Sequence, residues 1–440
     1  MDPATMTHED TRVFHRDVTN IPVRVERAEG VHIWDETGNR FLDASSGLNV
    51  VVNIGYGVQE VLDAMQKQAA LVTFCGGFTS APQEELAGVL ANMAPGDLNH
   101  VRFTSGGAEA TETAIKLARH YFVEIGQPSK WKIISRWKSF HGNTLGALAA
   151  SGYTARRLEY TPYLSNFPHI SPAYDLAAAE ELEAAILNEG PDEIAAFIAE
   201  PVVGSADLAR IPPEGYFKRV REICDKYDVL FIADEVLCGI GRTGKNFAID
   251  HWNVTPDMII FGKGVSSGYT PLGGVITTDG IYDAVSEGSG LFDHGYTYSG
   301  NPLSCAVGLA VLTYLNEHQL VERSAQTGQY LLNSLRLALA ESPIVGEISG
   351  LGMLTGIELV ADKSTRTPFA AAKRIGARIG KATRDRGVLI NPGFGAPSLP
   401  TDPERIGICP SFIFTREHVD EAVAALSAAI TQIAQEEGLA

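Results

Sequence analysis

Cysteine is scarce in this sequence, and no two cysteines stand close together. Only five occur in 440 residues, at Cys75, Cys224, Cys238, Cys305 and Cys409. Disulfide frameworks and cysteine-based zinc sites need closely spaced cysteines, usually a pair with two residues between them. The spacing argues against both kinds of site. We expect reduced thiols, no bound metal and a cytoplasmic location.

The sequence also lacks long hydrophobic runs and an excess of positive charge. No apolar run approaches the roughly 18 residues that a membrane-spanning helix needs, and the N-terminus does not show the basic-then-apolar layout of a signal peptide. With 35 lysines and arginines against 53 aspartates and glutamates, the formal charge is -18. Nucleic acids and anionic membranes are bound by basic surfaces, so we expect neither as a partner.

The remaining composition is that of a globular protein, with 45% apolar residues and 44 glycines. Alternating runs between residues 24 and 43 predict a meander of short antiparallel strands. Farther along, strands and helices alternate, which predicts an α/β fold whose sheet is mostly parallel and covered by helices on both faces. We predict a large domain over residues 60–310 and a smaller α+β domain from residues 1–59 and 311–440, because a chain of this length usually forms two domains.

Three apolar runs of strand length end on charged residues: Glu200, Asp234 and Lys263. A lysine that leaves a buried strand is costly unless it is paired, neutral or covalently bound, although it can also simply extend to solvent. In open α/β sheets, ligands bind beyond the carboxyl ends of the strands. Because three neighbouring strands would deliver these side chains to one edge, the pattern predicts an active site there.

A glycine-rich turn precedes a predicted helix at Ser105-Gly106-Gly107-Ala108. Such a turn leaves backbone N–H groups free at the positive end of the helix dipole, which suits a phosphate group. The alternative is an ordinary tight connection between a strand and a helix. The turn is therefore a candidate phosphate site. Whether it binds a phosphate depends on which functional residues lie near it.

A second glycine pattern, Gly239-Ile-Gly241-Arg-Thr-Gly244, matches the G-x-G-x-x-G fingerprint of nicotinamide dehydrogenases. That fingerprint should lie between a first strand and a helix, with an acidic residue about 20 positions later. Here the following residues 245–252 have poor helical character. An NAD-dependent dehydrogenase is therefore only a remote alternative.

A lysine, a carboxylate and a phosphate site together suit pyridoxal phosphate. This cofactor needs a lysine amine for its Schiff base, an anion opposite its pyridine nitrogen and a helix start for its phosphate. Asp234 would keep the ring nitrogen protonated, because a nearby negative charge favours the cationic form. Lys263, once displaced by a substrate amine, could then move the substrate proton as a general base and acid.

Six stretches resemble the motifs of the class III aminotransferases, the omega-aminotransferase family of fold type I pyridoxal-phosphate enzymes. They are Ser105-Gly-Gly-Ala-Glu-Ala110, Phe140-His-Gly142, Glu200-Pro-Val-Val-Gly204, Ala233-Asp-Glu-Val-Leu-Cys-Gly-Ile-Gly-Arg-Thr-Gly244, Phe261-Gly-Lys-Gly264 and Gly295-Tyr-Thr-Tyr-Ser-Gly-Asn-Pro302. They follow one another in the family's order, and the resemblance extends from about Arg24 to the last helix. It implies a seven-stranded, mostly parallel sheet in the large domain.

The resemblance also implies a role for each matching residue. Lys263 would be the Schiff-base lysine and Asp234 the partner of the pyridine nitrogen. The other cofactor contacts would be the phosphate turn, the residues on the two ring faces and their neighbours: Gly107, Ala108, Phe140, His141, Val236 and Glu200. We expect His141 to act through packing or orientation, and Arg242 to be structural. Thr297 would reach the phosphate from the neighbouring subunit, so the active sites would be shared across a homodimer.

Two positions depart from the family pattern. The family usually has serine where this chain has Ala108, and tyrosine where it has Phe140. One hydroxyl contact to the phosphate is therefore missing, which is tolerable because a hydrogen bond contributes a net of roughly 1 kcal/mol. Stacking on the ring survives at Phe140, but any hydrogen bond of the phenol is lost.

The sequence indicates the substrate-binding residues less clearly than the cofactor-binding ones. Arg405 is the candidate for binding a substrate carboxylate, with a surface ion pair as the alternative. Tyr153, Phe78 and the segment 47–53 are expected to line the pocket. We predict an aminotransferase that moves an amino group from an amine or omega-amino acid to a 2-keto acid, with pyruvate as the expected acceptor, by a ping-pong mechanism. A lyase or isomerase on the same cofactor, such as a dialkylglycine decarboxylase or an aminomutase, stays an alternative.

Overall fold

The structure is a computed structural model that describes residues 11–19, 22–393, 399 and 402–439. Within these residues the largest sheet has seven strands, in the order β4 (Leu98–Thr104), β10 (Gly273–Thr278), β9 (Met258–Phe261), β8 (Leu230–Asp234), β7 (Ile194–Ala199), β5 (Lys132–Arg136) and β6 (His169–Ile170). All of them run parallel except β10, which is antiparallel to both neighbours. The predicted mostly parallel sheet is confirmed.

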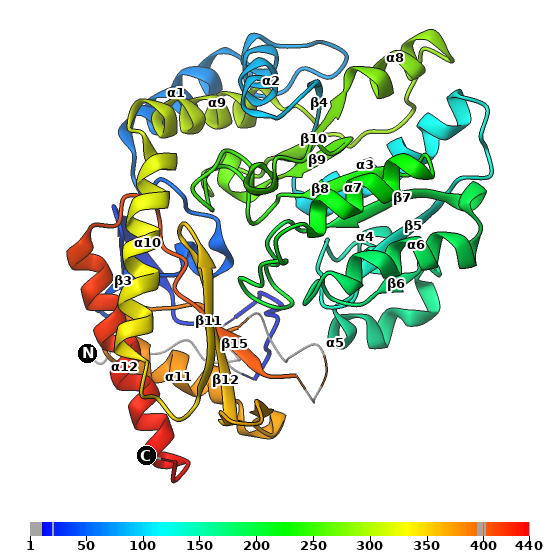
Figure 1. Cartoon of the computed structure of the whole chain (residues 1–440). Helices are drawn as coiled ribbons and strands as arrows, with labels where there is room; N and C mark the ends of the chain where they lie inside the picture. Colours follow the sequence, from blue (N-terminus) through cyan, green and yellow to red (C-terminus); the bar gives the residue numbers. More distant parts are fainter. Residues whose placement is uncertain (1–10, 20–21, 394–398, 400–401, 440) are drawn as a thin grey trace.

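Helices cover both faces of this sheet (Figure 1), and the alternation of side chains along the strands explains why. Ile198 and Ile232 belong to the core on one face, whereas Phe197 and Phe231, the preceding residues, belong to the core on the other. Successive side chains of a strand point to opposite faces, so strands that are apolar throughout need cover on both. The cover comes from α3 (Gly107–Glu124), α4 (Leu145–Ala150) and α8 (Asp279–Glu287) on one face and from α6 (Ala177–Glu189) and α7 (Tyr216–Lys226) on the other.

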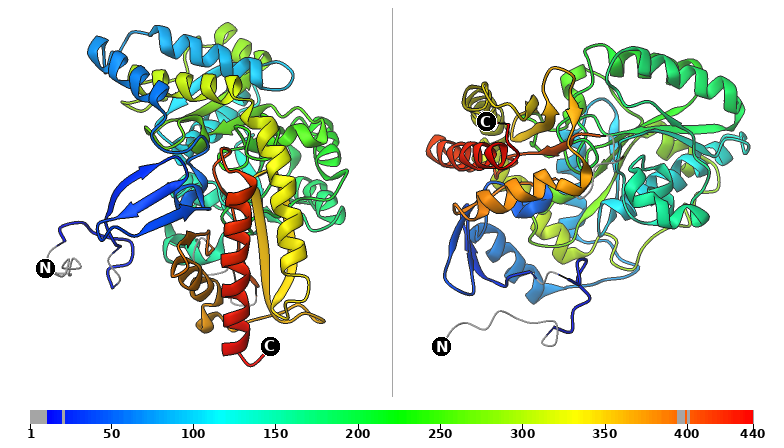
Figure 2. Two further views of the ribbon diagram at one scale, coloured as in Figure 1. Left: turned by 90° about the vertical axis from the view of Figure 1, so that its left-hand side faces the viewer. Right: turned by 90° about the horizontal axis from the view of Figure 1, so that it is seen from below.

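Two smaller sheets lie beside the large one. Within the described residues, one contains the predicted meander, β1 (Val25–Glu29), β2 (His32–Asp35) and β3 (Arg40–Asp43), joined in parallel by β14 (Val388–Leu389). The other contains β11 (Val345–Leu351), β12 (Leu354–Asp362), β13 (Thr367–Pro368) and β15 (Glu404–Ile406). The pairing of β3 with β14 joins an N-terminal segment to a C-terminal one, and Figure 2 shows the blue N-terminal strands beside the orange and red C-terminal helices. The domain boundaries at residues 60 and 310 stay a prediction.

The remaining long helices connect and cover these sheets. They are α1 (Gln59–Leu71), α2 (Ala81–Met93), α9 (Pro302–Glu317), α10 (Leu320–Ala338), α11 (Ile375–Arg384) and α12 (Arg416–Glu436). The apolar face of α12 is buried against α10 and α11. No helix in the described part of the chain is long and apolar enough to cross a membrane.

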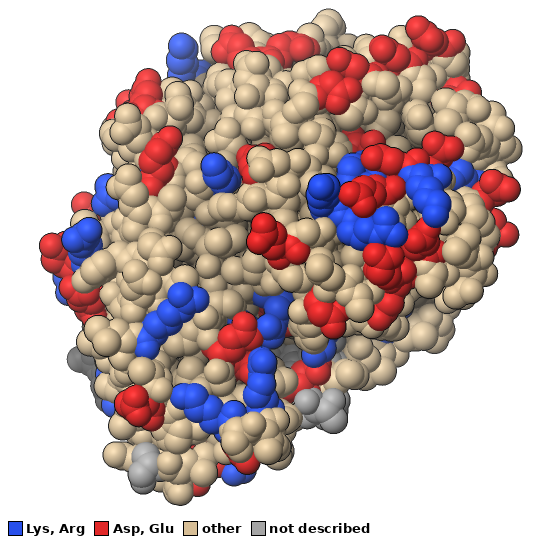
Figure 3. Space-filling view, in the orientation of Figure 1, with Lys and Arg blue, Asp and Glu red and all other residues tan. Residues whose placement is uncertain are grey.

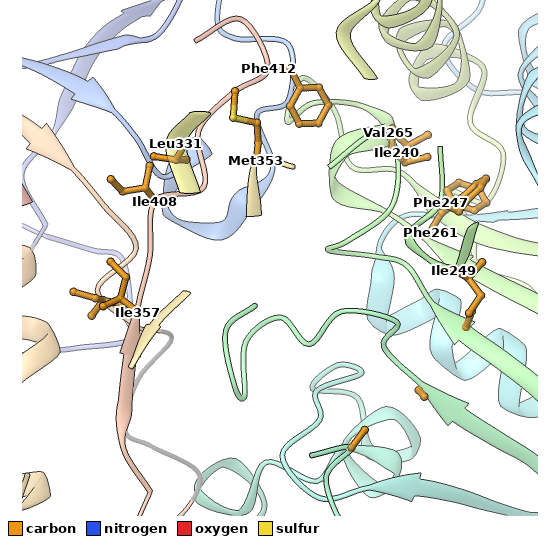
Figure 4. Packing of buried hydrophobic residues seen from close by; sticks show 14 of the residues in the cluster. Ile240, Phe247, Ile249, Phe261, Val265, Leu331, Met353, Ile357, Ile408 and Phe412 are labelled. Atoms are coloured by element: carbon orange, nitrogen blue, oxygen red, sulfur yellow. The ribbon is translucent and has the colours of Figure 1, made fainter. Parts of the chain in front are cut away.

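One buried cluster runs through both parts of the molecule. Figure 4 shows Phe247 and Phe261 beside the large sheet, and Met353 and Ile357 on the other side, at β12. All four side chains are fully buried. A continuous apolar core of this kind couples the two parts mechanically, because close-packed interiors resist relative displacement.

Candidate active site

A cavity of about 240 Å³ opens where the carboxyl ends of β7, β8 and β9 meet the start of α3. Larger hollows exist elsewhere, so chemistry rather than size distinguishes this one. Its lining contains charged, glycine and aromatic residues: Gly107, Ala108, Phe140, His141, Gly142, Asn143, Glu200, Ser205, Asp234, Val236, Leu237 and Lys263. Eight of the nine predicted cofactor contacts thus lie around one cavity, and the ninth, Thr297, does not. The parallel strands bring Glu200, Asp234 and Lys263 together.

Lys263 follows β9 after a single glycine, Gly262. Its backbone adopts a left-handed conformation with φ of 43°, an uncommon one for a residue with a side chain. Burial lowers the pKa of Lys263 below its ordinary value, while the carboxylates of Asp234 and Glu200 act in the opposite direction. The amine therefore lies in surroundings that favour its neutral, nucleophilic form more than water does.

Asp234 ends β8 and is held by two hydrogen bonds. Its Oδ1 accepts the backbone N–H of Val236 at 3.1 Å, and its Oδ2 lies 2.7 Å from Nδ1 of His141. The His141 side chain is fully buried, and its Nε2 lies 3.3 Å from the hydroxyl of Ser135. Because a carboxylate can only accept, the imidazole donates to Asp234. The arrangement fixes an anion at the base of the cavity.

Glu200 links two loops of the cavity wall. One carboxylate oxygen accepts the N–H of Phe140 at 3.0 Å, and the other accepts the N–H of Gly204 at 2.8 Å. Burial raises the pKa of Glu200, and the charge of His141 opposes this shift. The side chain thereby holds the segment after β5 against the segment after β7.

The start of α3 forms one side of the cavity. Gly106, which precedes the helix, has an extended conformation, and no side chain caps the helix there. The first N–H groups of a helix have no carbonyl partner within it. A Cβ atom on Gly107 would lie 2.8 Å from Cγ1 of Val236, so only glycine fits. The turn therefore presents open N–H donors next to a closely packed wall.

The structure separates the three predicted substrate residues, Tyr153, Phe78 and Arg405. Tyr153 is buried and meets the ring of Phe140 edge to face, with 6.4 Å between the ring centres. Phe78 is 80% exposed and does not line the cavity of its own chain. Thr297, predicted to reach the cofactor phosphate of the neighbouring subunit, is exposed in the segment between α8 and α9.

Arg405 lies in a different cavity, of about 340 Å³, and no residue described as lining that cavity also lines the Lys263 cavity. It is nearly completely buried and lies 3.5 Å from carboxylate oxygens of Asp207 and Glu358. It also donates to the carbonyl of Leu208 at 2.9 Å. The structure therefore does not bring Arg405 and Lys263 together, and it shows the arginine in a buried ion-pair network rather than on the surface.

The glycine pattern at 239–244 has no helix behind it. It is followed by a short 3₁₀ turn, Ala248–Trp252, instead of the α-helix that a dinucleotide site requires. Arg242, within the pattern, is fully buried and donates to the carbonyl of Met353 at 3.0 Å. These contacts are structural and give no support to a nicotinamide site.

Four residues near the cavity were not singled out from the sequence. Asn143 and Ser205 each lie one residue beyond a recognised motif, and Leu237 lies within the motif at residues 233–244. Arg156 lies over the Phe140 ring, with 4.5 Å between the guanidinium carbon and the ring centre. No pattern in the sequence connects residue 156 with residue 140. Only the folded chain brings them together.

Comparison with known proteins agrees with this geometry. The family model for class III aminotransferases matches residues 13–430. The chain is 41% identical to the putrescine–pyruvate aminotransferase of Pseudomonas aeruginosa over 78% of each protein. Its structure is similar to an (S)-enantioselective omega-transaminase from Thermomicrobium roseum, with a TM-score of 0.88, 38% identity and 94% of each chain covered. It is also similar to an omega-transaminase from Pseudomonas jessenii in complex with PMP, with a TM-score of 0.89, 31% identity, and 95% of this chain and 94% of that chain covered. The chain belongs to the class III aminotransferases, a family of pyridoxal-phosphate-dependent enzymes.

Proposed function

We propose that this aminotransferase holds pyridoxal phosphate on Lys263 and moves an amino group from an amine or omega-amino acid to a 2-keto acid, with pyruvate as the acceptor. The transfer proceeds in two half-reactions, so that the donor product leaves before the keto acid binds. The observation that carries the proposal is one cavity that combines a lysine amine, a buried carboxylate and an open helix start.

The residues present fit this cofactor. The free N–H groups at Gly107 and Ala108 suit its phosphate, and Asp234 supplies an anion for the ring nitrogen. Val236 and Phe140 both line the cavity and would cover the two faces of the ring. When bound, pyridoxal phosphate supplies an aldehyde that accepts the amino group and a ring that withdraws electrons from the reacting carbon.

The chain's own residues supply the proton transfer and the electrostatics. Lys263 Nζ would remove the proton from the donor carbon and return it in the second half-reaction, which a neutral amine does better than an ammonium group. The contact between His141 and Asp234 holds the carboxylate in place and supports its negative charge. Glu200 keeps the wall around Phe140 fixed.

We propose that two chains associate and share their sites. Thr297 is exposed in this chain, and exposed aromatic residues accompany it: Phe74 and Tyr298 meet edge to face, with ring centres 5.9 Å apart, beside the exposed Phe78. Exposed apolar groups gathered in one region are typical of an interface. A homodimer, with Thr297 reaching the phosphate of the neighbouring site, accounts for this exposure. We expect this homodimer in the cytoplasm.

Small molecules are the expected substrates. On the face in Figure 3, acidic and basic side chains are intermixed among large uncharged areas, which does not resemble a basic surface for nucleic acid. The similarity to a putrescine–pyruvate aminotransferase supports an amine donor and pyruvate as the acceptor.

The test is to incubate the purified protein with pyridoxal phosphate, a panel of amines and omega-amino acids, and pyruvate. Visible absorbance of the bound cofactor should bleach with a productive donor, and alanine should form when pyruvate is added. Release of carbon dioxide without alanine would contradict the proposal and would indicate a decarboxylase.

A further inference from the structure

The turn that carries Lys263 has an uncommon backbone. Lys263 and Ser267 both adopt the left-handed conformation, with φ of 43° and 48°. Residues with a Cβ atom avoid this conformation, and it persists only where the surrounding structure enforces it. The neighbours of the turn at residues 263–268 therefore decide how the Lys263 side chain is held.

Asn53 packs directly against this turn. A Cβ atom on Gly264, the second residue of the turn, would lie 2.2 Å from Nδ2 of Asn53, so only glycine fits while Asn53 keeps its place. The next residue, Ile54, donates its backbone N–H to Oγ of Ser267 at 3.1 Å. Asn53 is 2% exposed and does not itself line the active-site cavity. Two adjacent residues of the N-terminal segment thus contact the turn near its beginning and near its end.

The side-chain amide of Asn53 has partners that allow only one orientation. Its Oδ1 accepts a hydrogen bond from the guanidinium group of Arg242 at 2.5 Å, and its Nδ2 donates to the carbonyl of Ile240 at 3.2 Å. A guanidinium group only donates and a carbonyl only accepts, so the amide cannot flip. The backbone carbonyl of Asn53 accepts the N–H of Phe412 at 2.7 Å. Both the side chain and the backbone of Asn53 are therefore fixed.

Arg242 connects this support to distant parts of the chain. Its guanidinium group also donates to the carbonyls of Met353, at 3.0 Å, and Pro410. The guanidinium carbon lies 4.7 Å from the centre of the Phe412 ring. Arg242 is fully buried, so each acceptor matters, because a buried donor without a partner is costly. The position of Asn53 is thus determined from three separate parts of the chain.

We propose that Asn53 is a positioning residue that holds the turn at residues 263–268 and thereby aims the Lys263 amine at the aldehyde of the cofactor, an inference that rests on the proposed role of Lys263. A reacting group gains rate when its orientation is fixed before the reaction. Without the Asn53 amide the turn can relax from its left-handed conformation, and the amine then samples other directions. Because Asn53 acts through the turn and not through the phosphate site, its loss slows bond formation more than it weakens noncovalent binding.

The experiment separates formation of the bond to Lys263 from binding of the cofactor. Apoprotein is mixed with pyridoxal phosphate, and visible absorbance follows the condensation of the lysine amine with the aldehyde, which releases one water. Asn53→Ala should lower the first-order rate of this step about 10- to 100-fold. Pyridoxamine phosphate has an amine in place of the aldehyde, and its affinity should change by no more than about twofold. An unchanged rate, or equal losses for the two compounds, would overturn the proposal.

A compensating pair of variants tests the contact itself. In Gly264→Ala the new methyl group would meet the Asn53 amide, so the rate should fall about as far as in Asn53→Ala. The three atoms nearest to that methyl position all belong to the Asn53 side chain beyond its Cβ, and Gly264 is not left-handed. The double variant has room for the methyl group, so its rate should match that of Asn53→Ala, whereas multiplied losses would overturn the proposal. Gly264→Ala retains the hydrogen-bonding groups of Asn53 and Arg242, so it supplies the same measurements if Asn53→Ala does not fold.

Ser46→Ala is the matched control. The hydroxyl of Ser46 is another buried partner of Arg242, at 3.3 Å, and donates to the carbonyl of Cys409 at 2.7 Å. This variant disturbs the same arginine but keeps the amide that faces Gly264. It should lower the thermal stability and leave the rate of bond formation within about twofold of the wild type. A loss of rate equal to that of Asn53→Ala would overturn the proposal, because it would assign the effect to Arg242.

Hydrogen exchange of the apoprotein tests the inference without the cofactor. In Asn53→Ala the peptide that covers residues 263–268 should exchange about 10-fold faster or more, while α12 should keep its wild-type rate. Wild-type exchange in the turn contradicts the role of Asn53. Attachment of pyridoxal phosphate to a lysine other than Lys263 in the wild-type protein contradicts the proposed function itself, whatever the exchange shows.

Discussion

Nδ1 of His141 lies 2.7 Å from Oδ2 of Asp234, and both side chains are buried. The two residues come from different segments, 93 positions apart in the sequence. A buried carboxylate without a partner is costly, so the imidazole stabilises the charge that the cofactor ring would need. His141 is thus a positioning residue that acts through Asp234.

Replacing the imidazole tests this relationship. His141→Phe keeps a similar volume but removes the donor, and we expect it to weaken the binding of pyridoxal phosphate about 10- to 100-fold. Equilibrium titration followed by visible absorbance measures the effect. Ser135→Ala, which removes only the longer contact to Nε2 of His141, is the control and should bind the cofactor almost normally. If both variants bound equally well, the imidazole would have only a packing role.

The close approach of α3 to the cavity wall gives a second prediction. In Gly107→Ala the new methyl group would meet Val236 at 2.8 Å and push it toward the cofactor ring. We expect weaker cofactor binding with little change in thermal stability of the apoprotein. Gly106→Ala is a close control, because the neighbouring position is extended and has open space within 4 Å. A comparable loss in both variants would point to the helix start as a whole and not to this contact.

Lys130 provides a stability prediction away from the site. Its buried ammonium group lies 3.0 to 3.3 Å from the carbonyl oxygens of Pro191, Ile194, Tyr227 and Asp228. Lys130→Met keeps the aliphatic stem but leaves these carbonyls without their donor, which should cost about 3 kcal/mol of unfolding free energy. Thermal unfolding measures this loss. The control Lys381→Met, at a side chain that is 76% exposed, should change stability by about 0.5 kcal/mol or less.

His169 predicts a dependence of stability on acid pH. Burial, with a smaller contribution from the charge of Arg157, lowers the pKa of His169 to about 4. In the unfolded chain the pKa is about 6.5. Between these values only the unfolded chain takes up the proton, so the stabilisation is complete above pH 6.5 and is lost as the pH falls toward 4, by about 3 kcal/mol in total.

The measurement is urea unfolding of the wild type and His169→Gln at several pH values from 7.5 to 4.5. The difference in unfolding free energy between the two proteins should shift in favour of the variant as the pH falls. A difference that stays constant over this range would show that His169 gains its proton equally well in the folded protein.

Much of the fold could be predicted from local patterns. The runs that became β7, β8 and β9 are apolar and end on polar residues, and the apolar face of α12 repeats at helical spacing. The direction of β10 could not be predicted, because the sequence of a strand does not encode whether it runs parallel or antiparallel to its neighbours.

The side-chain surroundings were harder to predict than the elements. The ion-pair partners of Arg405 are Asp207, Glu347 and Glu358, which are distant from it in the sequence. No local sequence pattern indicates that these residues converge. The same holds for the contact between Arg156 and Phe140. Residues within motifs could be placed from the sequence, whereas residues whose role depends on long-range packing could not.

The most direct measurement is to locate the cofactor on the chain. Holoenzyme treated with sodium borohydride and digested should give a peptide that carries a reduced pyridoxyl group on Lys263, and Lys263→Ala should yield no such peptide. Attachment at another lysine, or a yellow Lys263→Ala protein that still bleaches with amines and forms alanine at the wild-type rate, would contradict the account.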